Sequence, residues 1–355
     1  MRIVFVAALL TACSSGGDPA VTPTPTSWST GVVTETFVDA TRPTPANGTA
    51  AALPSRTLPT EIWYPSGPGD TGSRARGAPA DRAHGPYPLV LFVHGSSGNR
   101  LQSTFLTRAL AEAGYVVAAA DHPLTAISTG GGPSDLHVDD QLDDLRFLAD
   151  RVAARAADAT SPIAGAVRSD QVAVIGHSTG GTVALLAAFA PDRHDDRVRG
   201  VVALAPCACF FGDAFFTTRR TPLLVVAGTG DLFVPPSNNG LRAYTLAGAP
   251  KAFVSLVGGT HVYFTDFGVP DSTLDPMPTT AHDAIAVALA RYGGGTACDP
   301  TPAPGTDAMI SLARQHDRTV TVTRAFLDDL FGRTHGAVAA LAATTDPLVR
   351  WQRQP

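Results

Sequence analysis

Continuous apolar runs of four to six residues recur along this chain and alternate with segments whose apolar residues are spaced three or four apart. The runs are typical of strands buried on both faces of a sheet, and the wider spacing is typical of helices with one buried face. The predicted strands are residues 89–93, 115–120, 172–175, 200–204, 222–227 and 252–257. The predicted helices are residues 101–113, 138–152, 180–188, 282–291, 322–331 and 336–342. This alternation predicts an α/β domain with a mostly parallel central sheet and helices on both faces.

The N-terminal part of the predicted domain has a different pattern. Residues 30–42 and 56–65 alternate apolar and polar positions, which predicts two antiparallel strands at the leading edge of the sheet. Residues 66–86 are rich in Gly, Pro, Ser and Arg and predict a surface loop. With 355 residues and 44% hydrophobic content, the chain is long enough for one large domain, and nothing in it requires two. We therefore predict a single domain over residues 31–355.

The first residues have the features of an export signal. The apolar run at residues 3–10 is too short to span a bilayer. Residues 10–13, Leu-Thr-Ala-Cys, resemble a bacterial lipobox, in which the cysteine is lipidated after cleavage. We therefore predict a lipoprotein signal peptide at 1–12, a lipid on Cys13 and a flexible tether at 13–30, and hence an exported protein of the cell envelope. The alternatives are a soluble secreted protein with a simple signal, or a misplaced start codon.

The charges of the chain limit its partners. A formal net charge of -5 gives no reason to expect nucleic acid, which usually requires a basic stripe. A run of carboxylates at Asp139, Asp140, Asp143 and Asp144 could suggest calcium. Their helical spacing, and the absence of a loop-type ligand pattern, favour a solvated helix face instead. We therefore expect neither nucleic acid nor a metal ion.

The chain has four cysteines, and lipidation of Cys13 would leave three. In the oxidising compartment of an exported protein, three thiols allow one bridge. Cysteines two residues apart rarely bridge each other, so we expect Cys298 to pair with Cys207 or Cys209, and take Cys209 as the working choice. A metal site is the alternative, but a C-x-C pair with one distant cysteine lacks the usual ligand spacing.

Residues 171–181, Q-V-A-V-I-G-H-S-T-G-G, carry the first sign of catalytic chemistry. A strand pattern stops at Gly176, a helix of small residues begins at Gly180, and Ser178 lies between them. This G-x-S-x-G arrangement predicts a nucleophile elbow, a strained turn that exposes a serine hydroxyl and needs glycines where a Cβ would clash. The alternative is an ordinary glycine-rich turn in which Ser178 is a helix N-cap.

A second glycine turn, residues 94–98, follows the predicted strand at 89–93 and reads His-Gly-Ser-Ser-Gly. A turn of this kind supplies one backbone N–H for an oxyanion, and the residue after the nucleophile supplies another. The predicted donors are therefore the N–H groups of Ser96 and Thr179. We expect His94 to pack beneath the turn rather than to take part in catalysis.

A nucleophilic serine needs a histidine, which a carboxylate in turn orients. Asp231 follows the predicted strand at 222–227, and His261 follows the one at 252–257, each after a short glycine-rich turn. The chain order of serine, acid and histidine is the one found with elbow serines. The rival acids and histidines follow no clear strand or fall in helical stretches, and they are Asp213, Asp266, His282 and His316. The predicted triad is Ser178, Asp231 and His261.

These motifs resemble those of the α/β-hydrolase superfamily. Between residues 55 and 343 the chain is most similar to the branch that holds dienelactone-hydrolase-like proteins, platelet-activating-factor acetylhydrolases and cutinase-like polyester hydrolases. The matching segments are residues 61–65, 88–98, 114–123, 176–181, Asp231 and 258–261. Dienelactone hydrolases use a cysteine nucleophile, so Ser178 implies a serine esterase instead. Polyester hydrolases carry an aromatic residue where this chain has Ser96, so the resemblance to them is looser there.

The residues and the resemblance together predict a lipid-anchored serine esterase that cleaves carboxylic esters through an acyl-enzyme and needs no cofactor. The expected substrate is a small-molecule ester, and the expected state is a monomer. The alternatives are a peptidase or amidase, which shares acyl-transfer chemistry, and a catalytically silent protein with the same fold. The complete triad argues against a silent protein, because such a protein has no physical need for all three residues.

The connection between residues 206 and 221 predicts the size of the substrate. It holds only 14 residues, too few for a large lid domain, and four of them are Phe210, Phe211, Phe215 and Phe216. We expect some of these rings to pack in the core and others to wall the acyl site. Such a wall would fill the space of a long chain, and each excluded methylene forfeits about 0.8 kcal/mol of burial. The sequence therefore predicts an esterase for short acyl chains.

Overall fold

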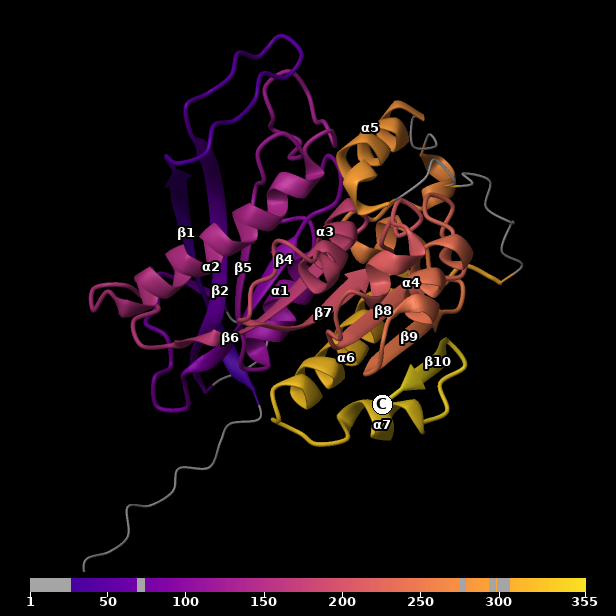
Figure 1. Cartoon of the computed structure of the whole chain (residues 1–355). Helices are drawn as coiled ribbons and strands as arrows, with labels where there is room; N and C mark the ends of the chain where they lie inside the picture. The colour runs from indigo at the N-terminus through magenta and orange to yellow at the C-terminus, as the bar shows by residue number, and fades with distance from the viewer. Residues whose placement is uncertain (1–26, 69–73, 275–278, 294–297, 299–306) are drawn as a thin grey trace, which may run out of the picture.

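A sheet of ten strands forms the centre of the computed structural model, which describes residues 27–68, 74–274, 279–293, 298 and 307–355 (Figure 1). The strand order is β10-β9-β8-β7-β6-β4-β5-β2-β1-β3. The strands are β1 (Trp28–Asp39), β2 (Arg56–Pro68), β3 (Arg74–Arg76), β4 (Tyr87–Val93), β5 (Val116–Ala120), β6 (Val167–His177), β7 (Val198–Leu204), β8 (Leu223–Gly228), β9 (Lys251–Leu256) and β10 (Val349–Gln354). Strands β4 to β9 are parallel, whereas β2 and β10 join antiparallel. This confirms the predicted mostly parallel sheet.

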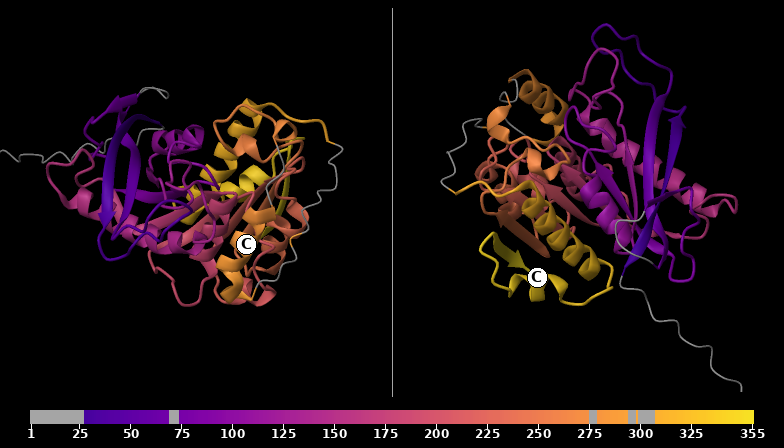
Figure 2. Two further views of the ribbon diagram at one scale, coloured as in Figure 1. Left: turned by 90° about the horizontal axis from the view of Figure 1, so that it is seen from above. Right: turned by 180° about the vertical axis from the view of Figure 1, so that it is seen from behind.

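Helices cover both faces of the sheet, as predicted (Figure 2). They are α1 (Thr104–Glu112), α2 (Gln141–Ala157), α3 (Thr179–Phe189), α4 (Gly240–Leu246), α5 (Thr279–Leu289), α6 (Leu312–Leu330) and α7 (Ala337–Ala342). Successive side chains of β4 belong to different core layers because side chains alternate along a strand. Leu89 and Leu91 lie in the layer of α2 and α3, and Val90 and Phe92 lie in the layer of α1 and α6.

Four elements differ from the sequence prediction, and one of them, α4, has no counterpart among the predicted helices. β3 lies within the predicted surface loop at 66–86, where it pairs with β1. α6 begins at Leu312, well before residue 322, and this start was not predicted because the buried face of its first turns carries Gln315 and Thr319 instead of apolar residues. β10 was not predicted, since its sequence is mostly polar and its side chains are mostly exposed. In these segments the secondary structure depends on backbone pairing or on tertiary packing rather than on an apolar pattern.

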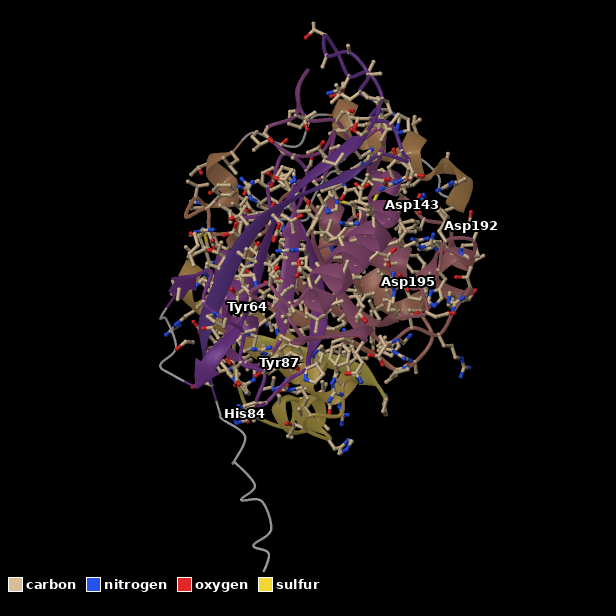
Figure 3. All side chains as sticks on the ribbon, turned by 90° about the vertical axis from the view of Figure 1, so that its left-hand side faces the viewer. Tyr64, His84, Tyr87, Asp143, Asp192 and Asp195 are labelled. Carbon is tan, nitrogen blue, oxygen red and sulfur yellow. A yellow bond between two sulfur atoms is a disulfide. The ribbon has the colours of Figure 1, made fainter. Side chains whose placement is uncertain are left out.

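The predicted tether extends too far into the domain. β1 begins at Trp28, whose ring is buried and meets the rings of Tyr87 and His84 edge to face. Figure 3 labels these two partners. The indole N–H donates to Asp81 at 2.9 Å. Because these contacts fix the chain, the domain begins at Trp28 rather than at residue 31. The predicted signal peptide and Cys13 lie outside the described residues.

None of the helices in the described part of the chain is long and apolar enough to cross a membrane.

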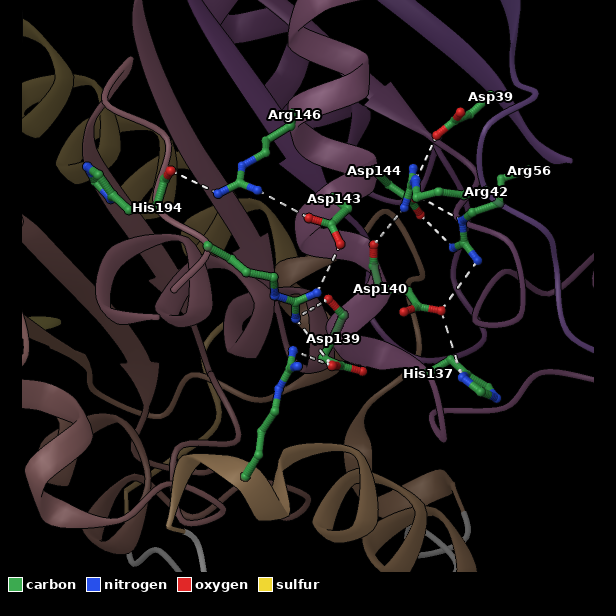
Figure 4. A network of polar contacts seen from close by, with 12 residues as sticks. Asp39, Arg42, Arg56, His137, Asp139, Asp140, Asp143, Asp144, Arg146 and His194 are labelled. Carbon is green, nitrogen blue, oxygen red and sulfur yellow. Dashed lines mark hydrogen bonds and ion pairs between the residues drawn. The ribbon is translucent and has the colours of Figure 1, made fainter. Parts of the chain in front are cut away.

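The predicted solvated face of α2 is wrong at Asp144. This carboxylate is fully buried and accepts hydrogen bonds from Arg56 at 2.7 and 2.8 Å and from Arg42 at 2.8 Å (Figure 4). The ion pairs of its neighbours include Asp139–Arg193, Asp140–Arg56 and Asp143–Arg193. Because a buried carboxylate needs paired positive charge, the arginines from outside α2 decide which aspartate is buried. No group of three or more His, Cys, Asp or Glu residues in the described part of the chain could hold a metal ion.

The carboxyl ends of the parallel strands meet at one edge of the sheet. β4 ends at Val93, β6 at His177, β8 at Gly228 and β9 at Leu256. The register pairs Val93 with Gly176 of β6, and Gly228 with Leu256. The turns that follow these strands therefore lie together, which is where open α/β sheets bind their ligands.

Candidate active site

Ser178 lies on a sharp turn between β6 and α3. Its backbone has φ 56° and ψ -123°, a conformation that residues with a Cβ rarely adopt. A Cβ on Gly176 would lie 1.9 Å from the carbonyl oxygen of Gly180, and a Cβ on Gly180 would lie 2.2 Å from that of Val93. Close backbone approach therefore requires both glycines of the predicted G-x-S-x-G motif. The turn puts Ser178 at the edge of the sheet where the other strand-end turns meet.

The turn after β4 lies against the serine. A Cβ on Gly95 would lie 3.1 Å from Cβ of Ser178, so the glycine permits this close approach. Oγ of Ser96 donates to Asp135 Oδ2 at 2.7 Å, whereas its N–H meets no acceptor among the described residues. The N–H of Thr179 is the first of α3 and has no carbonyl of its own helix to meet. Two backbone donors beside Ser178 are thus free, as an oxyanion site requires.

His94 packs beneath this turn, as expected. Its Nδ1 lies 2.8 Å from the carbonyl oxygen of Gly95, and its Nε2 accepts the N–H of His122 at 3.2 Å. Burial, together with the charge of His122, lowers the pKa of His94 to about 3. His94 is therefore a neutral support of the turn.

Asp231 and His261 lie in the turns after β8 and β9 and face each other. His261 Nδ1 lies 2.8 Å from Asp231 Oδ2. Asp231 Oδ1 accepts the N–H groups of Phe233 and Val234 at 2.9 and 2.7 Å. The acid is therefore held by its own turn and has one oxygen for the imidazole. With a proton on Nδ1, Nε2 of His261 is left as an acceptor, which is the tautomer that a general base needs.

Ser178 and His261 line one cavity of about 1130 Å³. Its apolar walls are formed by Leu136, Phe233, Phe267, Val269, Leu274 and Val287. The described lining residues include the carboxylates of Asp135 and Asp283 and no lysine or arginine. No hydrogen bond joins Ser178 to His261 within the described structure. Such bonds often form only when a substrate is bound.

Neighbouring charges set the protonation of the histidine. Burial alone lowers the pKa of His261, but the charge and hydrogen bond of Asp231, with the charge of Asp271, raise it above its ordinary value. Burial raises the pKa of Asp231, although His261 opposes this shift. His177 lies beside His261, with ring centroids 4.6 Å apart, and burial lowers its pKa well below the ordinary value. His177 therefore adds no competing positive charge.

The sequence of the chain matches the model of a known protein family. The model of the PET hydrolase-like family matches residues 38–274, which span the turns from Ser96 to His261 and cover more than half of the chain. The chain belongs to the PET hydrolase-like family. It is a carboxylic ester hydrolase of the α/β-hydrolase superfamily, which confirms the family and the enzyme class predicted from the motifs.

A solved structure of a ferulic acid esterase from Streptomyces cinnamoneus is similar to this PET hydrolase-like chain. The two share 25% sequence identity and superpose with a TM-score of 0.61, over 95% of this chain and 98% of that one. No curated protein is detectably similar. The likeness over nearly the whole of both chains confirms the predicted fold class and its lack of a large lid domain.

The rival acids and histidines make structural contacts elsewhere in this PET hydrolase-like domain. Asp213 pairs with Arg242, Asp266 accepts the first N–H groups of α1, His282 packs on Phe210, and His316 stacks on Phe105. None of the four lines the cavity that holds Ser178. Of the predicted triad, Ser178 and His261 line this cavity, and Asp231 contacts it only through its hydrogen bond to His261.

The predicted aromatic wall of the acyl site is wrong. Phe210, Phe211, Phe215 and Phe216 are all buried, and none of them lines the cavity. Phe211, Phe215 and Phe216 pack on one another and, in part, on Phe189 at the end of α3. Aromatic rings gain most when apolar partners surround them, which an open cavity cannot provide. These rings therefore support α3 from its buried side and do not limit the acyl group.

The roof of the cavity was not predicted. It is formed by the segment after His261, with Phe267, and by α5, with Ala281, Ala284 and Val287. Phe267 is 52% exposed and Val287 is 67% exposed, so both apolar side chains are open to solvent at the cavity. The spacing of three along α5 was the available signal, but it is shared by any helix with one apolar face.

Cys209 and Cys298 form a disulfide with Cα atoms 5.2 Å apart, and Cys207 is a buried free thiol. The bridge joins the connection after β7 to the chain that follows α5. The bridge therefore ties the C-terminal side of the roof to the domain. Burial raises the pKa of the free thiol of Cys207 to about 12, so this thiol stays neutral.

Proposed function

We propose that this ester hydrolase uses Ser178 as its nucleophile, His261 as its general base and Asp231 to orient the histidine. The observation that carries the proposal is that Ser178, on its strained turn, opens into the same cavity as His261, whose Nδ1 lies 2.8 Å from Asp231. A serine hydroxyl becomes an effective nucleophile only when a base of this kind can take its proton.

In the proposed first half-reaction, Oγ of Ser178 attacks the ester carbonyl while Nε2 of His261 takes the hydroxyl proton. The N–H groups of Ser96 and Thr179 stabilise the resulting oxyanion. The imidazolium, stabilised by ionised Asp231, then gives its proton to the leaving alcohol and leaves an acyl group on the serine. In the second half-reaction, water attacks this acyl-enzyme, His261 takes a proton from the water and returns it to Oγ, and the carboxylic acid leaves.

The cavity favours neutral esters with a bulky apolar group. Its volume of about 1130 Å³ slightly exceeds that of typical ligand pockets, which measure about 300–1,000 Å³. Asp135 and Asp283 would repel an anionic group near the ester. Because the four buried phenylalanines do not wall the cavity, they do not restrict the substrate to short acyl chains. We therefore propose activity on short esters and also on aryl and longer acyl esters.

We also propose export with a lipid on Cys13. Trp28 contacts Tyr87, the first residue of β4, whereas the cavity lies beyond Val93, the last. A strand of this length separates its two ends by about 20 Å. An anchor at the N-terminus would therefore leave the mouth of the cavity free. Membrane fractionation with mass analysis of the mature N-terminus tests this, and a fully soluble protein with unmodified Cys13 would contradict it.

Labelling with a fluorophosphonate tests the nucleophile. Ser178→Ala should remove the label and lower kcat/KM for p-nitrophenyl acetate by on the order of 10⁴ or more. Ser272→Ala, an exposed serine of the roof, is the control and should keep both. Full activity of folded Ser178→Ala protein would overturn the proposal, and absent labelling of the natural chain would favour a silent protein.

A substrate panel tests the proposed range. Esters from p-nitrophenyl acetate to palmitate, with p-nitrophenyl benzoate, should be cleaved faster than the matching anilides, and faster anilide cleavage would favour an amidase. Phe267→Ala in the roof should lower the benzoate-to-acetate ratio of kcat/KM roughly tenfold, because an apolar contact is lost. Phe216→Ala should leave this ratio unchanged. The opposite result would restore the aromatic wall.

A further inference from the structure

Asp271 lies behind the histidine turn and is 2% exposed. Its carboxylate accepts the backbone N–H of His261 at 2.7 Å and that of Val262 at 2.8 Å. It also accepts the N–H of Leu232, the residue after Asp231, at 3.3 Å. One side chain therefore holds the turn of the histidine and the turn of the acid.

These contacts add to a direct backbone link between the two turns, in which the N–H of Gly230 donates to the carbonyl oxygen of Gly259 at 2.8 Å. Asp271 adds a second link between the backbones next to the imidazole and next to the acid, whose side chains are themselves hydrogen-bonded. Asp271 also lies within the roof segment that begins after His261 and includes Phe267 and Val269. The roof and the two turns therefore share one buried carboxylate.

Asp271 also faces the imidazole as a charge. The groups that face His261 are Asp231 from the turn after β8, Phe233 from the same turn, His177 from the end of β6, and Asp271. His177 is held neutral by burial, so the two aspartates are the charged members. A negative charge here stabilises the imidazolium that forms when the serine gives up its proton.

The same segment offers an internal comparison. Asp266 accepts the N–H groups of Thr104 and Phe105 at 2.8 and 3.1 Å, at the start of α1. Its contacts anchor the roof segment to α1 and do not reach the histidine. Asp266 and Asp271 are thus two anchors of one segment, of which only Asp271 meets the catalytic turns.

We propose that Asp271 is a positioning residue for ester hydrolysis, which holds the backbones of the His261 and Asp231 turns in register and supplies a second negative charge behind the imidazole. This inference rests on the proposed roles of Ser178, His261 and Asp231. No contact of Asp271 with substrate is required, since it acts through the two turns.

Asp271→Asn tests both effects of the carboxylate. The amide oxygen can replace only one of the two accepting carboxylate oxygens, so the N–H bonds to the other are lost, and the charge is lost as well. We expect kcat for p-nitrophenyl acetate to fall on the order of 10- to 100-fold with KM little changed, because the loss of alignment affects the chemical step. The acidic limb of the kcat/KM profile should move to lower pH, since the pKa of His261 falls when a neighbouring negative charge is removed.

Asp266→Asn is the matched control. It removes an anchor of the same roof segment, so it should lower the melting temperature while the acidic limb stays in place. Two results would overturn the proposal. One is an Asp271→Asn variant with the natural kcat and an unshifted acidic limb. The other is a variant whose kcat falls only in proportion to its lowered melting temperature, with the acidic limb unshifted.

A second variant covers the case in which Asp271→Asn does not fold. Asp271→Glu keeps the charge and displaces it by one methylene, so kcat should fall while the acidic limb stays near its natural pH. A natural kcat in Asp271→Glu would overturn the positioning role. End-point fluorophosphonate labelling counts the competent sites in each variant. Failure of the triad itself appears separately, as full activity in Ser178→Ala or His261→Ala.

Discussion

Two buried histidine–aspartate pairs in this protein have similar geometry and different surroundings. His261 Nδ1 lies 2.8 Å from Asp231, and His122 Nδ1 lies 3.2 Å from Asp144. Asp144 also accepts hydrogen bonds from two arginines (Figure 4). The second oxygen of Asp231 accepts only main-chain N–H groups among the described residues.

The two surroundings have opposite effects on the carboxylates. Burial raises the pKa of Asp231, whereas Asp144 has its pKa held below the ordinary range, because hydrogen bonds from His122 and Arg56 outweigh its burial. His261 borders the cavity, and His122 has no exposed surface. Of the two pairs, His261–Asp231 is therefore the one suited to acid–base chemistry. In the described part of the chain no arginine binds its carboxylate, and its imidazole reaches the cavity.

The largest difference between the pairs is expected in turnover. His261→Ala should lower kcat/KM for p-nitrophenyl acetate on the order of 10⁴-fold or more, because no base remains to take the serine proton. His122→Ala should change kcat/KM only a few-fold, since His122 does not reach the cavity. Steady-state kinetics on protein shown to be folded by circular dichroism makes the comparison. Equal losses in both variants would mean that the pairs are not functionally distinct.

The next largest difference is expected in stability. Asp144→Asn removes the closer and fully buried counter-charge of Arg56 and leaves only the more distant Asp140, and removing one partner of a buried pair typically costs about 3–5 kcal/mol. Urea unfolding should show this loss, while kcat/KM of the folded fraction stays close to that of the natural chain. An unchanged free energy of unfolding would show that the network in Figure 4 contributes nothing to the fold.

As the pH is lowered, activity should be lost before the stabilising effect of Asp144 is lost. Because His261 must be neutral to accept a proton, kcat/KM should fall tenfold per pH unit below its pKa, which is raised above the ordinary value of about 6.5. Asp144 has a lowered pKa, so its stabilising effect is present above the unfolded value of about 3.9 and is lost only as the pH falls through the lower folded value.

The raised pKa of His261 acts on stability in the opposite direction. Its stabilising contribution is present below the unfolded value of about 6.5 and is lost as the pH rises through the folded value. Paired pH profiles of kcat/KM and melting temperature check both signs. A melting temperature that falls together with activity between neutral pH and pH 5 would contradict this separation.

The smallest effect is expected at the neighbour of Asp144. Asp143 also pairs with an arginine, but its side chain is 32% exposed. Asp143→Ala should therefore lower the free energy of unfolding by only about 0.2–1 kcal/mol, as for other surface ion pairs. The same urea experiment compares it with Asp144→Asn. A loss as large as that of Asp144 would show that burial does not distinguish the two carboxylates.

Strand and helix periodicity gave most of the layer structure because it reflects local geometry. The runs at 89–93 and 172–175 lie within β4 and β6, and the glycines around Ser178 follow from backbone contacts inside one turn. The periodicity failed at β10 and at the start of α6. Their polar sequences carry no apolar pattern, and their structure depends on pairing with β9 or on distant packing partners.

By itself, the sequence determined the α/β class, the strained turn of Ser178, and the strand-end positions of Asp231 and His261. These depend on local spacing and on the rule that parallel strands end at one edge of a sheet. Only the tertiary structure decided that Phe211 and Phe216 face the core, that Phe267 and α5 roof the cavity, and that Asp271 meets the histidine turn. The local sequence around an aromatic ring or a carboxylate is the same whether the side chain packs in a core, lines a cavity or forms an ion pair. Its partners come from residues far away in the chain, and those partners decide its role.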